Sequence, residues 1–207
     1  MAKKNQANAA PLETEVAVEG KKSKNVFLKI IIWLFVAAGI CLGTFFFTTN
    51  FIMRWPISGS SMTATVLDGD DVLVFKTKKI NYDDVIIFFC PEIKNHDSDE
   101  GTYLCKRVIG KAGDEISVKY DSENQCYHVY RNGTLLPEDK IYAPMTSMGS
   151  WQESTVIVPE GKYYVLGDNR NNSTDSSLPH RIFADEDNVV GKVFLRVSSS
   201  KSFGIVK

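Results

Sequence analysis

A run of 18 residues without a charged side chain, from Ile30 to Phe47, constrains this chain more than any other feature of its sequence. At about 1.5 Å of rise per residue, a helix over this run is about 27 Å long, close to the ~30 Å hydrocarbon core of a bilayer. Apolar residues at Val26–Leu28 and Phe51–Met53 extend the run, and the Lys29 side chain is long enough to reach the headgroups. The sequence therefore predicts a transmembrane helix over about residues 26–48.

Two kinds of cleaved segment are the alternatives to an uncleaved anchor. A secretory signal has a shorter apolar region and small residues at its cleavage site, whereas residues 48–52 read Thr-Thr-Asn-Phe-Ile. A lipoprotein signal has a small residue before its cysteine, and here the bulky Ile40 precedes Cys41. We therefore expect the helix to remain in the protein as its membrane anchor.

Charges on either side of the anchor predict its orientation. Residues 1–25 carry five lysines and few large apolar side chains, which is typical of a flexible tail. With Lys29, six lysines precede the apolar run, and only Arg54 follows it closely. Because basic residues stay on the cytoplasmic side, we expect a cytoplasmic tail and an extracytoplasmic segment over residues 49–207.

The outer segment consists of short runs of β-branched and aromatic residues, separated by Gly, Pro, Asn and Asp. None of it has the sustained 3.6-residue period of an amphipathic helix. This pattern predicts a mainly β domain, either a sandwich or a barrel. Residues 131–134, Arg-Asn-Gly-Thr, predict a tight hairpin turn. The predicted strands cover residues 71–76, 84–89, 102–109, 115–119, 127–130, 154–158, 162–166 and 190–197.

Composition bounds the partners and cofactors. The net charge of −1 lacks the basic surplus that nucleic-acid binding needs. The outer segment holds Cys90, Cys105 and Cys126, an odd number, so at least one is unpaired or bonded to another chain. Cys90 and Cys105 could face each other across one hairpin and form a disulfide. The three histidines are scattered without metal-ligand spacing, so we expect neither a metal nor a cofactor.

Three segments stand out as carriers of chemistry. Residues 57–66 read Ile-Ser-Gly-Ser-Ser-Met-Thr-Ala-Thr-Val, residues 106–114 read Lys-Arg-Val-Ile-Gly-Lys-Ala-Gly-Asp, and residues 167–176 read Gly-Asp-Asn-Arg-Asn-Asn-Ser-Thr-Asp-Ser. Taken alone, each is the pattern of an ordinary loop, strand edge or polar turn. In this order behind an anchor, the patterns G-x-S-M, K-R-V-I-G-x-x-G-D and G-D-N-R-x-N-S-x-D-S resemble the bacterial type I signal peptidases. The resemblance covers most of residues 26–197.

The resemblance implies a membrane-bound serine endopeptidase that removes N-terminal signal peptides from exported preproteins. Its fold would be an all-β catalytic domain of coiled, barrel-like sheets, with residues 115–165 as a small β cap. Ser61 would be the nucleophile, Lys106 the general base, and Ser173 would hold the lysine amine. The Ser61 backbone N–H would help to form the oxyanion hole.

In some relatives, a hydroxyl two residues before the nucleophile assists the oxyanion hole. That position is Gly59 here, so the backbone serves alone or with Ser58 or Ser60. Elementary chemistry agrees with the pair of Ser61 and Lys106, because a serine hydroxyl needs a base and Ser–Lys pairs are a known variant of the catalytic triad.

The lysine must be neutral to act as a base, although its ordinary pKa is about 10.4. Burial among apolar side chains can lower that pKa by several units. Lys106 is flanked by Leu104, Cys105 and Val108, which is typical of a buried strand, and no carboxylate is adjacent in the sequence. The sequence therefore favours a neutral amine at this position.

Charged residues around the third segment are expected to support the site rather than to react. Asp168, Arg170 and Asp175 would fix the loop that carries Ser173, and Arg107 is a candidate partner of Asp175. Relatives usually have Arg where Ser177 stands, so Arg107 or Arg181 would replace the missing partner of the loop aspartate. They also have Pro, Leu and Pro where this chain has Ala64, Val66 and Ala112. These departures suggest a specialised substrate range, such as pilins.

The substrate is expected to dock as an added β-strand, in pockets that by resemblance accept small side chains, as in Ala-x-Ala. Ile57, Met62, Leu104 and Cys105 are the candidate pocket residues, with ordinary core packing as the alternative. Residues 51–55 include three apolar side chains and Trp55, and would lie at the bilayer surface. Two other functions stay open: a self-cleaving Ser–Lys repressor-type protease, which would be soluble, and a non-catalytic pilin-assembly factor or chaperone.

Overall fold

The computed structural model of the chain describes residues 13–94, 100–146, 151–178, 182–197 and 203–206. The chain divides into two compact units, Met1–Thr48 and Thr49–Lys207. Each unit is described by itself.

The first unit is the greater part of one long helix, α1 (Glu13–Phe51). Its stretch Val26–Phe51 is long and apolar enough to cross a membrane, and the large apolar side chains of this stretch are exposed. We expected a flexible tail up to residue 25, but the helix begins at Glu13, so that prediction is wrong for residues 13–25. These residues are rich in helix-forming Glu, Ala and Lys, and extending an existing helix requires no new nucleation. Residues 1–12 of the expected tail lie outside the described residues.

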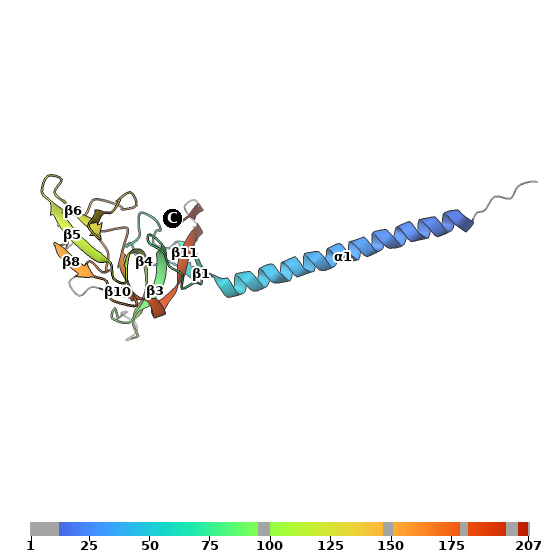
Figure 1. Cartoon of the computed structure of the whole chain (residues 1–207), viewed down its shortest axis with the longest axis horizontal. Helices are drawn as coiled ribbons and strands as arrows, with labels where there is room; N and C mark the ends of the chain where they lie inside the picture. The colour runs from blue at the N-terminus through green and yellow to red at the C-terminus, as the bar shows by residue number, and fades with distance from the viewer. Residues whose placement is uncertain (1–12, 95–99, 147–150, 179–181, 198–202, 207) are drawn as a thin grey trace, which may run out of the picture. The chain divides into compact units, whose positions relative to one another are not determined.

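The second unit is built from two antiparallel sheets, which confirms the mainly β prediction. Figure 1 shows strands β5, β6 and β8 gathered at one end of this unit and β1 and β11 at the other. The large sheet contains β1 (Ile52–Pro56), β2 (Asp71–Phe75), β3 (Val85–Cys90), β4 (Thr102–Lys111), β9 (Lys162–Leu166), β10 (Phe183–Asp185), β11 (Val189–Val197) and β12 (Gly204–Ile205). The small sheet contains β5 (Glu115–Asp121), β6 (Cys126–Arg131), β7 (Thr134–Leu135) and β8 (Ser154–Ile157), and a short 3₁₀ helix, η2 (Glu186–Asn188), precedes β11.

The large sheet has the strand order β1-β2-β11-β3-β4-β9-β10. Trp55 on β1 and Tyr103 on β4 nevertheless contact each other, with ring centroids 4.9 Å apart, although three strands separate them in that order. The sheet therefore curls on itself, as expected for a coiled, barrel-like architecture. The first and third motif segments follow the ends of β1 and β9, and the second begins within β4.

Strand β3 lies at the centre of the packing because both of its faces are covered. Ile86 and Phe88 belong to one apolar cluster, and Val85 and Ile87 belong to another on the opposite face. This explains the continuous apolar run in its sequence, since a strand buried on both faces does not alternate. A third cluster joins the small sheet to the large one through Tyr164 on β9 and contains Ile116, Val118, Val129 and Leu166.

Two local predictions meet different outcomes. The hairpin turn is confirmed, because Arg131 pairs with Thr134 and both Asn132 (φ 51°) and Gly133 (φ 77°) have the positive φ that such a turn needs. The disulfide is wrong: Cys90 pairs with Thr102 in the β3–β4 register, and Cys105 lies opposite Ile87. Both thiols are therefore free. The small sheet ends at Ile157 and residues 162–166 return to the large sheet, so the expected cap range 115–165 is too long.

Candidate active site

The loop between β1 and β2 places Ser61 on a short turn held against the core. Val66 N–H donates to the Met62 carbonyl at 2.8 Å, which closes one turn of chain directly after Ser61. Met62 and Val66 are both buried in the apolar cluster on one face of the large sheet. Gly59 has φ +95°, a conformation that favours glycine, and its N–H donates to Asp68. Two buried apolar side chains therefore fix the turn that presents Ser61.

Strand β4 brings Lys106 to this serine. Lys106 Nζ lies 2.6 Å from Ser61 Oγ, within hydrogen-bond distance. Lys106 is only 2% exposed, and no carboxylate among the described residues forms an ion pair with it. Burial lowers the pKa of the Lys106 amine, while the more distant charges of Asp175 and Asp168 oppose this effect without cancelling it. The pair thus combines contact with a base whose neutral form is favoured.

The loop after β9 is hydrogen-bonded to the turn of Ser61 through amide groups. Asn169 N–H donates to the Ser61 carbonyl at 2.9 Å, and the Asn169 side chain donates to the Ser60 carbonyl at 3.0 Å. The Asn172 side chain donates to Ser60 Oγ, also at 3.0 Å. Sequence reasoning treated these asparagines as parts of a polar turn. The sequence signal that could have identified them is the amide side chain, which can donate hydrogen bonds. Both asparagines lie in the third segment, near residues that were assigned supporting roles.

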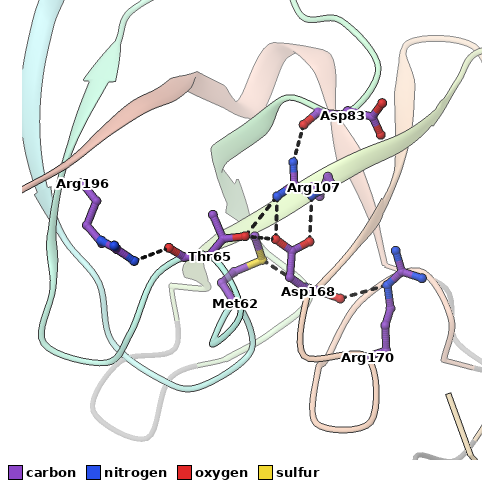
Figure 2. A network of polar contacts seen from close by, with 8 residues as sticks. Met62, Thr65, Asp83, Arg107, Asp168, Arg170 and Arg196 are labelled. Carbon is purple, nitrogen blue, oxygen red and sulfur yellow. Dashed lines mark hydrogen bonds and ion pairs between the residues drawn. The ribbon is translucent and has the colours of Figure 1, made fainter. Parts of the chain in front are cut away.

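A buried ion pair ties the same loop to β4 and to the serine turn (Figure 2). Arg107 donates to both carboxylate oxygens of Asp168, at 2.8 and 2.6 Å, and to the Asp83 carbonyl at 2.6 Å. Thr65, which sequence reasoning missed, donates its hydroxyl proton to Asp168 and accepts from Arg107. Asp168 N–H lies 3.4 Å from Met62 Sδ. The ion pair therefore joins all three segments.

The expectation that Arg107 pairs with Asp175 is wrong, since the ion pair of Arg107 is with Asp168. The Asp175 carboxylate instead accepts from Gly167 N–H at 2.9 Å and from the hydroxyl of Ser177 at 2.7 Å. Ser177 therefore supplies a short neutral partner for this carboxylate. Arg181, the other candidate replacement, lies outside the described residues.

Ser173 lies beside the site without the expected bond to the lysine. Within the described part of the chain, its buried Oγ has no hydrogen-bond partner. Its position is close to the nucleophile turn, because a Cβ added at Gly167 would meet both Ser173 Oγ and the Ser61 carbonyl oxygen at distances that real side chains do not reach. Ser173 is thus a buried, unpaired hydroxyl next to the pair of Ser61 and Lys106.

The surroundings of Ser61 include an unused backbone donor. Across the described ranges, no acceptor is found for the Ser61 N–H. Ser60 is held by Asn172, and because its Oγ accepts that bond, its own proton is left to donate elsewhere. Ser58 and Ser60 are both exposed. The contact with Asn172 therefore distinguishes Ser60 from Ser58 among the two candidate hydroxyls.

The four candidate pocket residues differ in position. Ile57 and Met62 are buried in the core cluster beside β2. Leu104 and Cys105 are partly buried and pack against opposite clusters. Because side chains alternate along a strand, Leu104 lies on the same face of β4 as Lys106.

One edge of β4 is open where it approaches the lysine. Strand β3 pairs with β4 from Thr102 to Arg107, whereas β9 pairs with it only from Arg107 to Lys111. Residues 102–106 are therefore paired by the named strands on one side only. An extended peptide could add to this edge and reach the pair of Ser61 and Lys106.

One family model and several known proteins are similar to this chain. The model of the family described as signal peptidase, peptidase S26, matches residues 26–198. Signal peptidase IB of Staphylococcus aureus (strain COL) is 31% identical over 187 residues, which cover 81% of this chain and 89% of that protein. A probable signal peptidase I-1 of Synechocystis is 31% identical over 156 residues, or 72% of each chain. The crystal structure of a signal peptidase I from Enterococcus faecalis V583 aligns with a TM-score of 0.40 and 28% identity, over 55% of this chain and 96% of that one.

Proposed function

This chain belongs to the signal peptidase family, peptidase S26, and we propose that within it Ser61 is the nucleophile and Lys106 the general base. The chain is a membrane-anchored serine peptidase that removes signal peptides from preproteins. The observation that carries the proposal is the 2.6 Å separation of Ser61 Oγ and Lys106 Nζ at a buried site. The non-catalytic assembly factor is not favoured, because both reactive groups are present and in contact.

The reaction follows from these two groups. Neutral Lys106 takes the proton of Ser61 Oγ while the oxygen attacks the scissile carbonyl carbon. The resulting ammonium then gives its proton to the leaving amine, so that the mature protein departs and the signal peptide remains as an ester on Ser61. Lys106 then takes a proton from water while the water oxygen attacks the ester carbon. As the bond to Ser61 Oγ breaks, the ammonium returns its proton to that oxygen and the signal peptide leaves with a free carboxyl group, which restores the serine and the neutral amine.

The oxyanion of each tetrahedral intermediate would be held by the Ser61 N–H, which has no acceptor among the described residues. Ser60 is the second donor that we favour, because the amide of Asn172 leaves its hydroxyl proton available. One oxyanion donor is worth about 10²–10³-fold in kcat. We expect a loss of this order in Ser60→Ala and a smaller effect in Ser58→Ala, and the reverse order would assign the donor to Ser58.

Ser173 and Asp175 support the base in this proposal. The Ser173 hydroxyl, which has no partner among the described residues, is the group that we assign to accept a hydrogen bond from the lysine amine. Asp175 holds Gly167 N–H at 2.9 Å and so keeps the strand end beside Ser173 in place. Arg107 supports the site indirectly, through its ion pair with Asp168.

The substrate would add to the open edge of β4 over residues 102–106, where main-chain hydrogen bonds give affinity. Leu104 is the pocket residue that we retain, since it shares a face with Lys106 and is partly exposed. Ile57 and Met62 are core residues, and Cys105 packs on the opposite face.

A cleavage assay with the full chain in detergent tests the proposed pair. We expect Ser61→Ala and Lys106→Ala to leave no measurable cleavage of a preprotein, because either change removes one half of the proton transfer. Ser122→Ala and Lys119→Ala, two changes of the same type at exposed positions of the small sheet, should cleave at the wild-type rate. Cleavage by all variants alike would overturn the assignment.

The orientation and the substrate range are further parts of the proposal. Six lysines precede the apolar run and one arginine follows closely, so the outer unit would lie outside the cytoplasm. Protease added to intact cells should then degrade epitopes in residues 49–207 and spare an N-terminal tag. Competition between pilin and general preproteins would show whether the chain is dedicated to pilins, as the changes at Ala64, Ala112 and Ser177 suggest.

A further inference from the structure

A loop of the small-sheet region, residues 136–146, is attached to the loop that holds the nucleophile. Tyr142 N–H donates to the Asp168 carbonyl at 2.8 Å. The Asn171 side chain donates to the Pro144 carbonyl at 2.8 Å and accepts from Thr146 N–H at 3.0 Å. The loop over residues 167–172 therefore lies between this segment on one side and the turn of Ser61 on the other.

The charged contact in this attachment is the ion pair of Glu138 with Arg170, at 2.7 Å. The Arg170 side chain is 5% exposed, and Glu138 is its ion-pair partner among the described residues. Arg170 also donates to the Gly167 carbonyl at 3.2 Å, and its own carbonyl accepts from Trp151 at 3.1 Å. A buried guanidinium is thus held between Glu138 and the backbone of Gly167, the residue that adjoins Ser173.

The segment is also joined to β6 near both of its ends. Leu136 N–H donates to the Val129 carbonyl at 2.9 Å, and Tyr127 N–H donates to the Met145 carbonyl at 2.7 Å. A pocket of about 350 Å³ is lined by Glu138, Tyr142 and Met145 of the segment and by Cys126 and His128 of β6. The polar contacts with residues 167–171 therefore act together with those to β6 in setting the position of the segment.

We infer that Glu138 is a positioning residue for catalysis, acting through Arg170 on the loop that aligns Ser61 with Lys106. The inference deepens the proposed function and depends on it. When the Glu138 carboxylate is lost, Arg170 keeps its charge in a buried site without a counter-charge. The guanidinium then moves toward water and takes the Gly167 carbonyl with it. Asn169 and Asn172 follow, and with them the bonds that hold Ser60 and Ser61.

The test is steady-state cleavage of a quenched-fluorescence peptide with an Ala-x-Ala site by the full chain in detergent. Glu138→Gln is expected to lower kcat by about 10- to 100-fold, the scale of a misplacement of about 1 Å, with little change in KM. Arg170→Gln should have a similar effect, and the double variant should be no worse than either one, because both changes remove the same constraint.

Two control variants separate positioning from a general loss of stability. Asp139→Asn removes a carboxylate one residue away at an exposed position and should retain wild-type kcat. Val189→Ala weakens an apolar cluster of the large sheet that contains none of residues 136–146, and should also retain kcat while the protein is folded. All rates are measured at a temperature at which circular dichroism shows every variant to be folded.

Wild-type kcat in Glu138→Gln would overturn the inference, as would an equal loss of kcat in Val189→Ala. Fully additive losses in the double variant would also contradict it, because Glu138 would then act independently of Arg170. These failures differ from a failure of the proposed function, in which Ser61→Ala itself would continue to cleave the peptide.

Discussion

Replacing Asp168 by asparagine should strongly destabilise the outer unit, because this carboxylate is the counter-charge of a buried guanidinium. The Arg107–Asp168 pair is shielded from water, with side-chain exposures of 2% and 0%. Asp168→Asn keeps the shape of the side chain and removes the charge, so the guanidinium stays buried without the carboxylate that balances its charge. Removing one partner of a buried pair costs about 3–5 kcal/mol.

The cost translates into a measurable shift in thermal unfolding. The outer unit, Thr49–Lys207, has 159 residues. For a domain of this size, 1 kcal/mol corresponds to roughly 2–4 °C in Tm, so the expected decrease is about 6–20 °C. Near-ultraviolet circular dichroism of the full chain in detergent would follow the loss of packing around its tryptophans and tyrosines.

The matched control is Asp71→Asn, which breaks the Arg54–Asp71 pair at the surface. The Arg54 side chain is 70% exposed, so water replaces its partner and Tm should change little. A decrease for Asp168→Asn no larger than that for Asp71→Asn would refute the reasoning, since burial would then add nothing to the cost of losing the carboxylate.

Three further outcomes follow from the site. Because burial lowers the pKa of Lys106 from its ordinary 10.5, kcat/KM should rise with pH to a midpoint below 10.5 and fall on acidification as the amine gains a proton; a midpoint at or above 10.5 would contradict this. Burial raises the pKa of the Cys105 thiol from 9.0 to about 12, so its thiolate fraction is about 1000-fold lower, and iodoacetamide at pH 8 should label it slowly until the protein is denatured. Gly167→Ala should lower kcat by about 100-fold or more, because the new Cβ collides with Ser173 Oγ and the Ser61 carbonyl; normal turnover would mean that this contact has no role.

Strands were predictable where the signal is local. The eight predicted strands are all present, and the signals that predicted them, runs of β-branched and aromatic residues and the turn residues between them, act over a few positions. Strands β1, β7, β10 and β12 were missed. Strand β1 continues an apolar run, and the other three have only two or three residues, whose partner strands a local pattern cannot identify. The start of α1 at Glu13 was missed because helix extension depends on the neighbouring apolar segment more than on local composition.

Partners across the site were less predictable. The motifs selected Ser61 and Lys106, but the missing arginine at Ser177 made Arg107 a candidate partner of Asp175, whereas its ion pair is with Asp168. Which carboxylate faces the guanidinium depends on how the loop after β9 crosses β4, and no local pattern specifies this. The same reason explains why Thr65, Asn169 and Asn172 were not assigned roles. Their partners lie more than 100 residues away in the sequence.

The most direct measurement is the identity of the covalent intermediate. The full chain is mixed with a preprotein, quenched in acid within the first turnover and digested for mass spectrometry. The account predicts a signal-peptide acyl group on the peptide that contains Ser61, and no acyl group in Ser61→Ala or Lys106→Ala. An acyl group on another residue, or continued cleavage by Ser61→Ala, would contradict the assignment of these two groups.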